Sequence, residues 1–557
     1  MLGPAKSRRL DEPIAVSLED LVPQGHFYRH LEAKLDLGFV REWVDDHYAD
    51  RGRPSIDPVV FFKLQLVMFF EGIRSERQLI AMASLNLAHR WYLGYALDEE
   101  LPDHSSLTRI RQRLGVDTFA RFFERVVDLC QEAGLVWGRE LYVDATNVQA
   151  NADLDSLVPR FYHDAKSHVA GLFADDATKD EHDEDDADPP GVVLHEGVVQ
   201  LPSRPLPGAE AATESAPRWN LLEERRLDPN RPVVGSYQRT TDFRVSPTDP
   251  DATPMRTEGR TSLGYHDHYV VDGGKARVIL SALVTPADVM ENAPLRDLLW
   301  RVCFRRKLRP RQVTGDTTYG TVENIVALED AGIRAYVPLP DFDERTPFFG
   351  KGKFVYDGTV DAYRCPGGEV LPFRKHKYTE RVRVYQAPAA TCHACPLKTC
   401  CTDSVKGRQV KRSFDEPYLE RVRGYHATEA YQKAMRKRQV WVEPLFAEAK
   451  DWHGLRRFRL RGLANVNIEG LLIATGQNLK RFLALRGWGR RNAPCGSLVA
   501  LPWEPWPLVM AFDMMADQAR TASLDPRFLA AVLPAKGFFN TQAQYRPHSS
   551  PIRGDRG

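Results

Sequence analysis

The sequence predicts an α/β protein built on a mixed sheet, and three observations predict it. From Arg139 onward, short β-type apolar runs alternate with stretches of helical spacing. Two of these runs end at an acid. Asp144 directly follows Leu141-Tyr142-Val143, and Asp316 directly follows Val313-Thr314-Gly315. Before Arg139 the chain reads as helical up to about Gly115. The aspartates are so far apart in sequence that only a fold could bring them together.

The order of the expected elements narrows the fold class. Around the Gly273-Gly274 turn, residues 265–280 have the pattern of a hairpin. A helix over 292–307, a strand over 311–315, a helix over 322–331 and a strand over 333–338 follow. With acids at the ends of the first and fourth strands, this is the order of a ribonuclease-H-like core. A helix with a third acid should follow, and Glu443 in Trp441-Val442-Glu443-Pro444-Leu445-Phe446 is the candidate.

The N-terminal region, residues 1–130, is expected to be a helical domain. The segment 58–70 is apolar nearly all round, which is typical of a buried helix. A further helix is expected after Asp103, with Ser105 or Ser106 as its N-cap and three arginines on the following turns. Such a domain could read DNA as a helix-turn-helix, or it could only pack and dimerise, and helical pattern alone leaves both open.

The length indicates several domains, and the charge distribution indicates that acidic and basic residues are concentrated in different parts of the chain. A chain of 557 residues with 43% hydrophobic content exceeds what one core usually serves. The net charge is only +1, yet nine acids crowd into 175–188 and nine Lys or Arg into 433–461. A near-neutral total can therefore hide a basic surface that faces nucleic acid.

These patterns divide the chain into six parts. The core is expected in 135–154 and 246–347, and 428–487 adds the helix with the third acid and a basic segment. Between them lie an acidic, flexible insertion at 155–245 and a Cys-rich insertion at 348–427. The tail at 488–557 suggests no function.

The N-terminus and the cysteines bear on location. The start lacks the apolar region of a signal peptide, and no uninterrupted apolar stretch is long enough to span a bilayer, so a cytoplasmic protein without a membrane partner is expected. Five of the eight cysteines lie between Cys365 and Cys401, which favours metal over disulfides in a reducing compartment. The isolated Cys130, Cys303 and Cys495 are expected to be buried apolar residues.

Two chemical sites are candidates. Asp144 and Asp316, with Glu443 leaning over them, could hold two Mg²⁺ ions that activate an oxygen nucleophile and stabilise a leaving oxygen in phosphodiester chemistry. Singly, each acid is more often a cap, a turn former or a solvated side chain. Cys365, Cys392 and Cys395, with Cys400 or Cys401 as the fourth thiolate, suit a closed tetrahedral zinc site that folds a small insertion. Free thiols or redox chemistry are the alternative.

The chain resembles the DDE transposases of bacterial insertion sequences, in the insertion-sequence-1182-like branch, from about Ser55 to about Leu485. Four stretches carry the resemblance: Leu101-Pro102-Asp103-His104-Ser105-Ser106-Leu107-Thr108-Arg109, Tyr142-Val143-Asp144-Ala145-Thr146, Thr314-Gly315-Asp316-Thr317-Thr318-Tyr319-Gly320, and residues 442–480. The family signature has a Lys seven residues after its catalytic Glu, and Lys450 is seven after Glu443. Where the signature has a Tyr and an Arg, this chain has Arg436 and Gln439. Arg438 lies one residue before the position of the signature Arg.

The resemblance implies residue roles. Asp144, Asp316 and Glu443 would be the catalytic, Mg²⁺-binding or Mn²⁺-binding acids; Glu448 is the rival third acid, but it lacks a Lys at that spacing. Cys401 is favoured over Cys400, because the branch carries Cys-Pro, Cys-x-x-Cys-Pro-Leu and Cys-Thr. DNA-binding residues are expected to be the following: Lys450, Arg438, Arg456, Arg457, Arg461 and Arg109.

The resemblance also implies an activity. Metal-activated water would nick double-stranded DNA at the terminal inverted repeats, and a freed 3′-hydroxyl would attack target DNA. A homodimer on DNA, associated with the nucleoid, is expected. The competing hypotheses are a metal nuclease on the same fold that does not join DNA, and a non-catalytic DNA-binding protein. In a third, the acids are only caps and the basic run is a solvated face.

Overall fold

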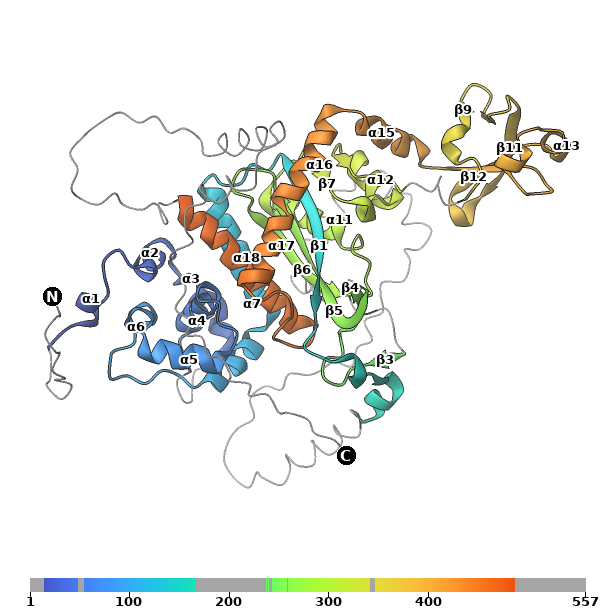
Figure 1. The fold of residues 1–557 in the computed structure, drawn as a ribbon. Helices are drawn as coiled ribbons and strands as arrows, with labels where there is room; N and C mark the ends of the chain where they lie inside the picture. The colour runs from blue at the N-terminus through green and yellow to red at the C-terminus, as the bar shows by residue number, and fades with distance from the viewer. Residues whose placement is uncertain are drawn as a thin grey trace, which may run out of the picture. The chain divides into compact units, whose positions relative to one another are not determined.

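The computed structural model describes residues 15–48, 55–166, 168, 237, 239, 243–257, 259–340 and 346–485. Most of the acidic insertion expected at 155–245, and the tail at 488–557, lie outside the described residues. The remaining chain forms an N-terminal group of helices, a mixed sheet with covering helices, and a second, smaller sheet (Figure 1).

The N-terminal helices form as the sequence predicts. The apolar segment becomes α4 (Pro58–Phe70), which begins with Pro58 after the N-cap Asp57 and is largely buried. The helix expected after Asp103 is α7 (His104–Glu132), but its N-cap is Asp103, whose carboxylate accepts from the Ser105 N–H at 2.8 Å. The expectation of Ser105 or Ser106 as N-cap is therefore wrong by two residues or more. The other helices of this group are α1 (Leu18–Leu21), α2 (Phe27–Lys34), α3 (Phe39–Val44), α5 (Glu76–Leu85) and α6 (Leu87–Leu93).

The main sheet is mixed and has six strands. Its order is β4-β5-β1-β7-β8, and β6 pairs with β5. The central strand β1 is antiparallel to β5 and parallel to β7, which is parallel to β8. The strands are β1 (Glu140–Gln149), β4 (Thr253–Thr257), β5 (Arg260–Asp272), β6 (Ile279–Pro286), β7 (Gln312–Thr314) and β8 (Arg334–Tyr336). Two short strands, β2 (Val158–Pro159) and β3 (Arg244–Val245), pair beside it.

The expected hairpin, helices and strands are all present. β5 and β6 form the hairpin, with Gly273 and Gly274 following β5. The two expected helices are α11 (Leu295–Arg306) and α12 (Val322–Asp330). One expectation is wrong: Asp144 lies in the middle of β1 rather than at its end, because β1 continues for five residues as the partner of a long β5. The mixed α/β class and the helical N-terminal region are confirmed.

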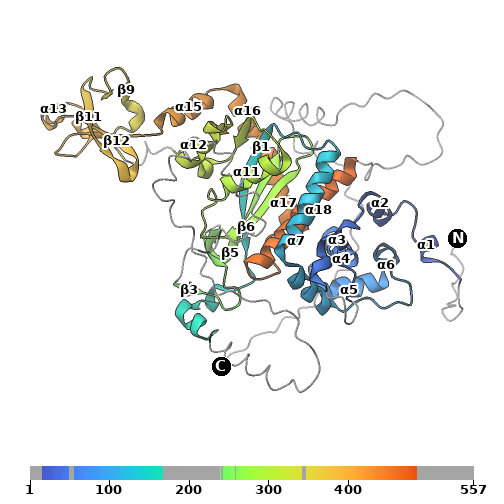
Figure 2. The ribbon, with the colours of Figure 1, turned by 180° about the vertical axis from the view of Figure 1, so that it is seen from behind.

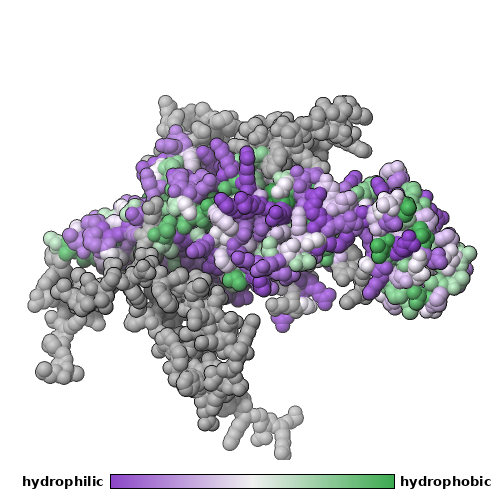
Figure 3. Space-filling model, turned by 90° about the horizontal axis from the view of Figure 1, so that it is seen from above, coloured by the Kyte–Doolittle hydropathy of each residue, from purple (hydrophilic) through white to green (hydrophobic). Residues whose placement is uncertain are grey.

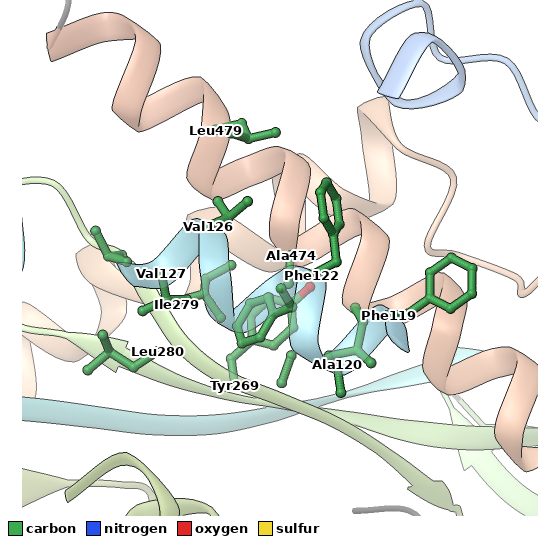
Figure 4. Close-up of a cluster of buried hydrophobic side chains, with 14 of the residues drawn as sticks. Phe119, Ala120, Phe122, Val126, Val127, Tyr269, Ile279, Leu280, Ala474 and Leu479 are labelled. Carbon is green, nitrogen blue, oxygen red and sulfur yellow. The ribbon is translucent and has the colours of Figure 1, made fainter. Parts of the chain in front are cut away.

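Helices cover both faces of the sheet. The chain returns through α15 (Glu416–His426), α16 (Glu429–Trp441), α17 (Glu443–Trp452) and α18 (Leu463–Leu485). In Figure 1, α16 and α17 lie over the sheet, and Figure 2 shows α11 over the opposite face. The long helices α7 and α18 pack together, and residues such as Phe122 and Ala474 meet the β5 and β6 side chains in one apolar cluster (Figure 4).

Two asparagines of α18 attach this helix to strand β6. Asn467 accepts from the Val284 N–H and donates to its C=O, both at 2.8 Å. Asn478 does the same with Ile279, at 2.9 Å and 2.8 Å. Each side-chain amide therefore pairs with the strand as a neighbouring strand would, which satisfies backbone groups that are buried away from water.

The Cys-rich insertion forms its own sheet. Five antiparallel strands lie in the order β13-β12-β11-β10-β9 around a small core that includes Leu371 and Tyr385. The strands are β9 (Val355–Asp357), β10 (Ala362–Arg364), β11 (Val370–Lys377), β12 (Val382–Gln386) and β13 (Gln409–Ser413), and the short helices α13 (Ala389–His393) and α14 (Lys398–Cys401) carry cysteines.

No helix within the described ranges has both the length and the apolar character needed to cross a bilayer.

Candidate active site

The site forms where β1 and β7 run side by side. Their parallel register pairs Tyr142 with Thr314. Asp144 and Asp316 each follow two residues later, so the register alone brings the two aspartates to the same end of the strand pair. Asp144 is 8% exposed. Asp316 begins a short 3-10 turn, because its carboxylate accepts from the Thr318 N–H at 2.8 Å.

Arg438 of α16 joins the two carboxylates. Its Nη2 lies 2.9 Å from Asp144 Oδ1 and 3.8 Å from Asp316 Oδ2. The structure thus brings both aspartates around one cation, the guanidinium of Arg438, whereas the metal site expected from the sequence stays a prediction. Arg438 was expected to bind DNA; in this structure its guanidinium contacts the aspartates.

Burial and charge shape the electrostatics of this pair. Burial raises the pKa of Asp144, Arg438 opposes that shift, and the nearby Asp316 carboxylate adds to it. The acids repel one another, so a cation between them is favourable.

A fourth acid, Glu291, belongs to the same surroundings. Burial raises its pKa, and the charges of Asp316 and Asp144 raise it further. The neighbouring Asn292 donates to the Thr318 backbone C=O at 3.1 Å, which ties the loop after β6 to the turn of Asp316. Sequence reasoning did not single out Glu291, because an acid in a loop carries no pattern and only the path of the loop brings it here.

Glu443 is the first residue of α17 and is exposed. It follows Arg438 by five residues, and only Val442, which is itself helical in conformation, separates α16 from α17. No hydrogen bond or ion pair joins Glu443 to either aspartate. Among the described residues, no group of three or more His, Cys, Asp or Glu side chains has an arrangement that could hold a metal ion.

The rival acid, Glu448, is committed to other partners. It forms an ion pair with Lys480, lies 3.4 Å from Arg481 Nη2, and accepts from Gln477 Nε2 at 3.2 Å. Burial alone would raise its pKa, but His453, Lys480 and Arg481 outweigh burial and lower it. Glu448 therefore attaches α17 to α18.

Four of the basic residues expected at DNA are exposed: Arg109, Arg456, Arg457 and Arg461. Three of them also make contacts within the protein, because Arg456 pairs with Asp451, Arg457 Nε donates to the Ala150 C=O at 3.2 Å and Arg461 Nε donates to the Asn151 C=O at 3.0 Å.

Lys450 is half-buried, and its charge acts on Asp267 of β5. Burial raises the pKa of Asp267 to about 8, and Lys450 opposes the shift. The structure therefore gives this lysine an acidic neighbour inside the protein, which the sequence spacing could not indicate.

Four cysteines line one small cavity in the second sheet. They are Cys365, Cys392, Cys395 and Cys401. Burial raises the pKa of Cys401, and the other three thiols add to the shift, while Arg408 lowers it. The Arg408 N–H also points to Cys392 Sγ, at 3.4 Å. Cys400 is exposed and does not line the cavity.

The other cysteines agree with expectation where they are described. Cys130 and Cys303 are buried, whereas Cys495 lies outside the described residues.

Comparisons with known families match two parts of the chain. Residues 16–113, which cover the N-terminal helices as far as the start of α7, match the family Transposase domain (DUF772). Residues 364–483, which include Arg438, Glu443 and most of α18, match the family Transposase DDE domain. No curated protein and no solved structure matches the chain. The two family matches support a DDE transposase.

Proposed function

We propose that this chain, whose two family matches support a DDE transposase, cuts DNA at the ends of an insertion sequence and joins those ends to target DNA. The observation that carries the proposal is the meeting of Asp144 and Asp316 around one cation. Residues 364–483, which match the DDE family, contain both that cation, Arg438, and the proposed third acid, Glu443.

The proposed core is ribonuclease-H-like. Strand order and direction support it, since β6, β5 and β1 are successively antiparallel while β1, β7 and β8 are parallel. Along the chain, the strands and helices also follow the order that the sequence predicted, with α11 before β7 and α12 before β8.

The ligand chemistry of the site, although not the present arrangement of the three described acids, fits a hard divalent cation. Carboxylate oxygens are the ligands that Mg²⁺ and Mn²⁺ prefer, and Arg438 already places a positive charge beside both aspartates. Asp144, Asp316 and Glu443 would hold the metal. When bound, it would supply an activated oxygen nucleophile and stabilise charge on the leaving oxygen.

The protein's own groups would orient that chemistry. Asp144 is held within β1, and Asp316 is fixed by the Thr318 N–H, so both carboxylates are positioned before DNA arrives. Arg438 could turn from the aspartates to a DNA phosphate, because a guanidinium matches either anion.

Two observations support Glu443 as the third acid. Glu448 is fully engaged with α18, whereas Glu443 lies exposed in the first turn of α17. Its position, five residues after Arg438 along the same pair of helices, keeps it on the segment that already reaches the aspartates.

DNA contacts are proposed for Arg109, Arg456, Arg457 and Arg461, which are all exposed, and for Arg438 once it is displaced. Lys450, Arg457 and Arg461 would act at DNA only in addition to their contacts within the protein. Double-stranded DNA with terminal inverted repeats, target DNA, a second copy of the chain and a cytoplasmic setting complete the proposal.

A structural Zn²⁺ is proposed for the four cysteines that line one cavity, with Cys401 rather than Cys400 as the fourth ligand, although the thiols of the described residues are not gathered into a metal-binding arrangement. The N–H of Arg408 directed at Cys392 is the kind of contact that stabilises a thiolate. This Cys-rich sheet also supports assignment to the insertion-sequence-1182-like branch.

The test is an assay of cutting and joining with the wild-type chain. A labelled duplex from the ends of the gene's own locus is incubated with Mg²⁺ or with EDTA. Metal-dependent cutting followed by joined products supports the transposase. Cutting without joining would favour a nuclease, and DNA binding without chemistry would favour a non-catalytic DNA-binding protein.

A further inference from the structure

Within the described ranges, part of strand β11 forms an unpaired edge of the second sheet, and this part carries several basic residues. β10 pairs only with Val370–Pro372 of β11, so the following residues of β11 have no strand on that side among the described residues. We call the surface formed by Phe373–Tyr378, together with Arg383, Lys411 and Phe414, the β11 ribbon. The pairing register of β11 with β12 shifts between Phe373 and Lys375.

The sheet that carries the β11 ribbon is strongly basic. Residues 355–413 contain eleven Lys or Arg and five Asp or Glu, a formal charge of +6, while the whole chain carries only +1. Positive charge is therefore concentrated in this sheet, which is the electrostatic footprint of a polyanionic partner.

Within the β11 ribbon, two basic side chains have no acidic partner among the described residues, and two more share one. Arg374 and Lys375 are exposed and form no ion pair with any described residue. Lys377 and Lys411 share the single acid Glu380.

The strand register also places basic residues side by side. His376 faces Arg383, which in turn faces Arg412. Arg383 lies 3.9 Å from Asp361 and Arg412 lies 2.7 Å from Glu420, so these two arginines have acidic neighbours that Arg374 and Lys375 lack among the described residues.

Aromatic rings stand among these charges. The ring of His376 lies 4.8 Å from that of Phe373, 5.5 Å from Tyr378 and 5.8 Å from Phe414. Tyr378 is 74% exposed and Phe373 is 39% exposed. In Figure 3 the lobe of this sheet shows hydrophobic residues scattered among hydrophilic ones on its surface.

Lysines on an edge strand can also serve only to prevent pairing with another chain. That role explains Lys375, but it gives no reason to leave Tyr378 and Phe373 exposed beside it. Basic side chains interleaved with exposed rings are typical of surfaces that hold phosphates and pack against sugars or bases.

We propose that the β11 ribbon is a DNA-binding surface, separate from the acidic site, in which Arg374, Lys375 and Lys411 contact phosphates of one duplex. Across β11, β12 and β13 the register sets Lys375, Val384 and Lys411 in one row, so basic side chains of two strands lie on the same face of the sheet. This inference rests on the proposed function, because it takes DNA as the substrate.

The experiment measures DNA affinity at several salt concentrations by fluorescence anisotropy, with a labelled duplex and the full chain carrying Asp144→Asn to prevent cutting. Arg374→Gln/Lys375→Gln is compared with Arg296→Gln/Arg309→Gln, which removes two exposed charges from the core. The ribbon variant should lower the slope of log K against log salt by about two, since each phosphate contact contributes about one. Arg374→Lys/Lys375→Arg, which keeps both charges, should retain the slope.

The outcomes separate this inference from the proposed function. An unchanged slope in the ribbon variant, or an equal fall in the core control, overturns the ribbon while leaving cutting by the wild-type chain intact. Failure of the Asp144→Asn chain to bind any duplex overturns both. Matching thermal unfolding of the variants excludes a folding defect as the cause of a lowered slope.

Discussion

A guanidinium between two carboxylates offsets their repulsion when no metal ion is bound. Arg438 lies in this position, within 4 Å of one oxygen of Asp144 and one of Asp316. The same charge opposes a divalent cation that must approach the same oxygens. Arg438 therefore offsets the repulsion between the two carboxylates and would compete with a metal ion for them.

Arg438→Gln should strengthen metal binding in the absence of DNA. Removing one positive charge at this distance should lower the Kd for Mn²⁺ by about tenfold, a change of ~1.4 kcal/mol. Calorimetric titration of the DNA-free protein measures the Kd. The matched control is Lys437→Gln, because Lys437 pairs with Glu140 instead. Weaker Mn²⁺ binding in Arg438→Gln would contradict this role.

Asp267 gives a pH dependence of stability with a defined sign. Its folded pKa of about 8 lies above the ordinary value of 3.8. The folded chain thus keeps a proton that the unfolded chain releases, and the contribution is full below about pH 4 and is lost as pH rises towards 8. Asp267→Asn has no carboxyl to ionise at this position, so the variant does not lose stability in this way.

The free energy of unfolding of Asp267→Asn relative to wild type should therefore rise with pH, by up to about 1.4 kcal/mol per unit between roughly pH 4 and 8. Urea denaturation at several pH values measures it. The exposed Glu323→Gln is the control and should follow wild type. A difference that stays constant with pH would show that Asp267 is already ionised in the folded state.

At this scale, residue patterns predicted the meeting of Asp144 and Asp316, because acids beside neighbouring strands need only the correct register. They could not predict the place of Arg438, which depends on how α16 crosses the sheet, or of Glu291, which depends on the path of a loop. The inward setting of Lys450 was missed for the same reason.

At the scale of elements, α18 does more than cover the sheet. Asn467 and Asn478 replace the strand that β6 lacks on this side, so the helix and the hairpin stabilise each other through buried amide pairs. The sequence predicted the β5–β6 hairpin from its glycines. It did not predict the attachment of α18, because this depends on two side chains three helical turns apart facing the same strand.

Asn478→Ala should destabilise the fold by about 2–4 kcal/mol, because it leaves the buried N–H and C=O of Ile279 without partners. Urea denaturation provides the measurement. Asn465→Ala, which loses only an exposed bond to the Arg461 C=O, should change stability by less than about 1 kcal/mol. Equal losses in the two variants would contradict the role of Asn478.

The Cys-rich sheet makes a discriminating prediction about adjacent thiols. Cys401→Ser should abolish a stoichiometric zinc of about one ion per chain, because Cys401 lines the cavity with the three other cysteines. Cys400→Ser should retain it, since Cys400 is exposed outside the cavity. Metal analysis of the purified variants reads out both. Zinc lost only from Cys400→Ser would exchange the two assignments.

For the whole molecule, function requires that distant segments meet. Asp144, Asp316 and the α16–α17 pair come from three separate parts of the chain, and the matched family segments supply only the last of these. The sheet brings the two aspartates together. The domain limits expected from composition, and the role of the segments outside the described residues, stay predictions.

The most direct test of the account compares the acids within one assay of DNA cutting and joining. Asp144→Asn, Asp316→Asn and Glu443→Gln should each lower the Mg²⁺-dependent rate by about a hundredfold or more, because each removes a proposed metal ligand. Glu448→Gln should retain chemistry, although it loosens α17 from α18. Full activity in Glu443→Gln with loss in Glu448→Gln would contradict the assignment of the third acid, and full activity in Asp144→Asn would contradict the site itself.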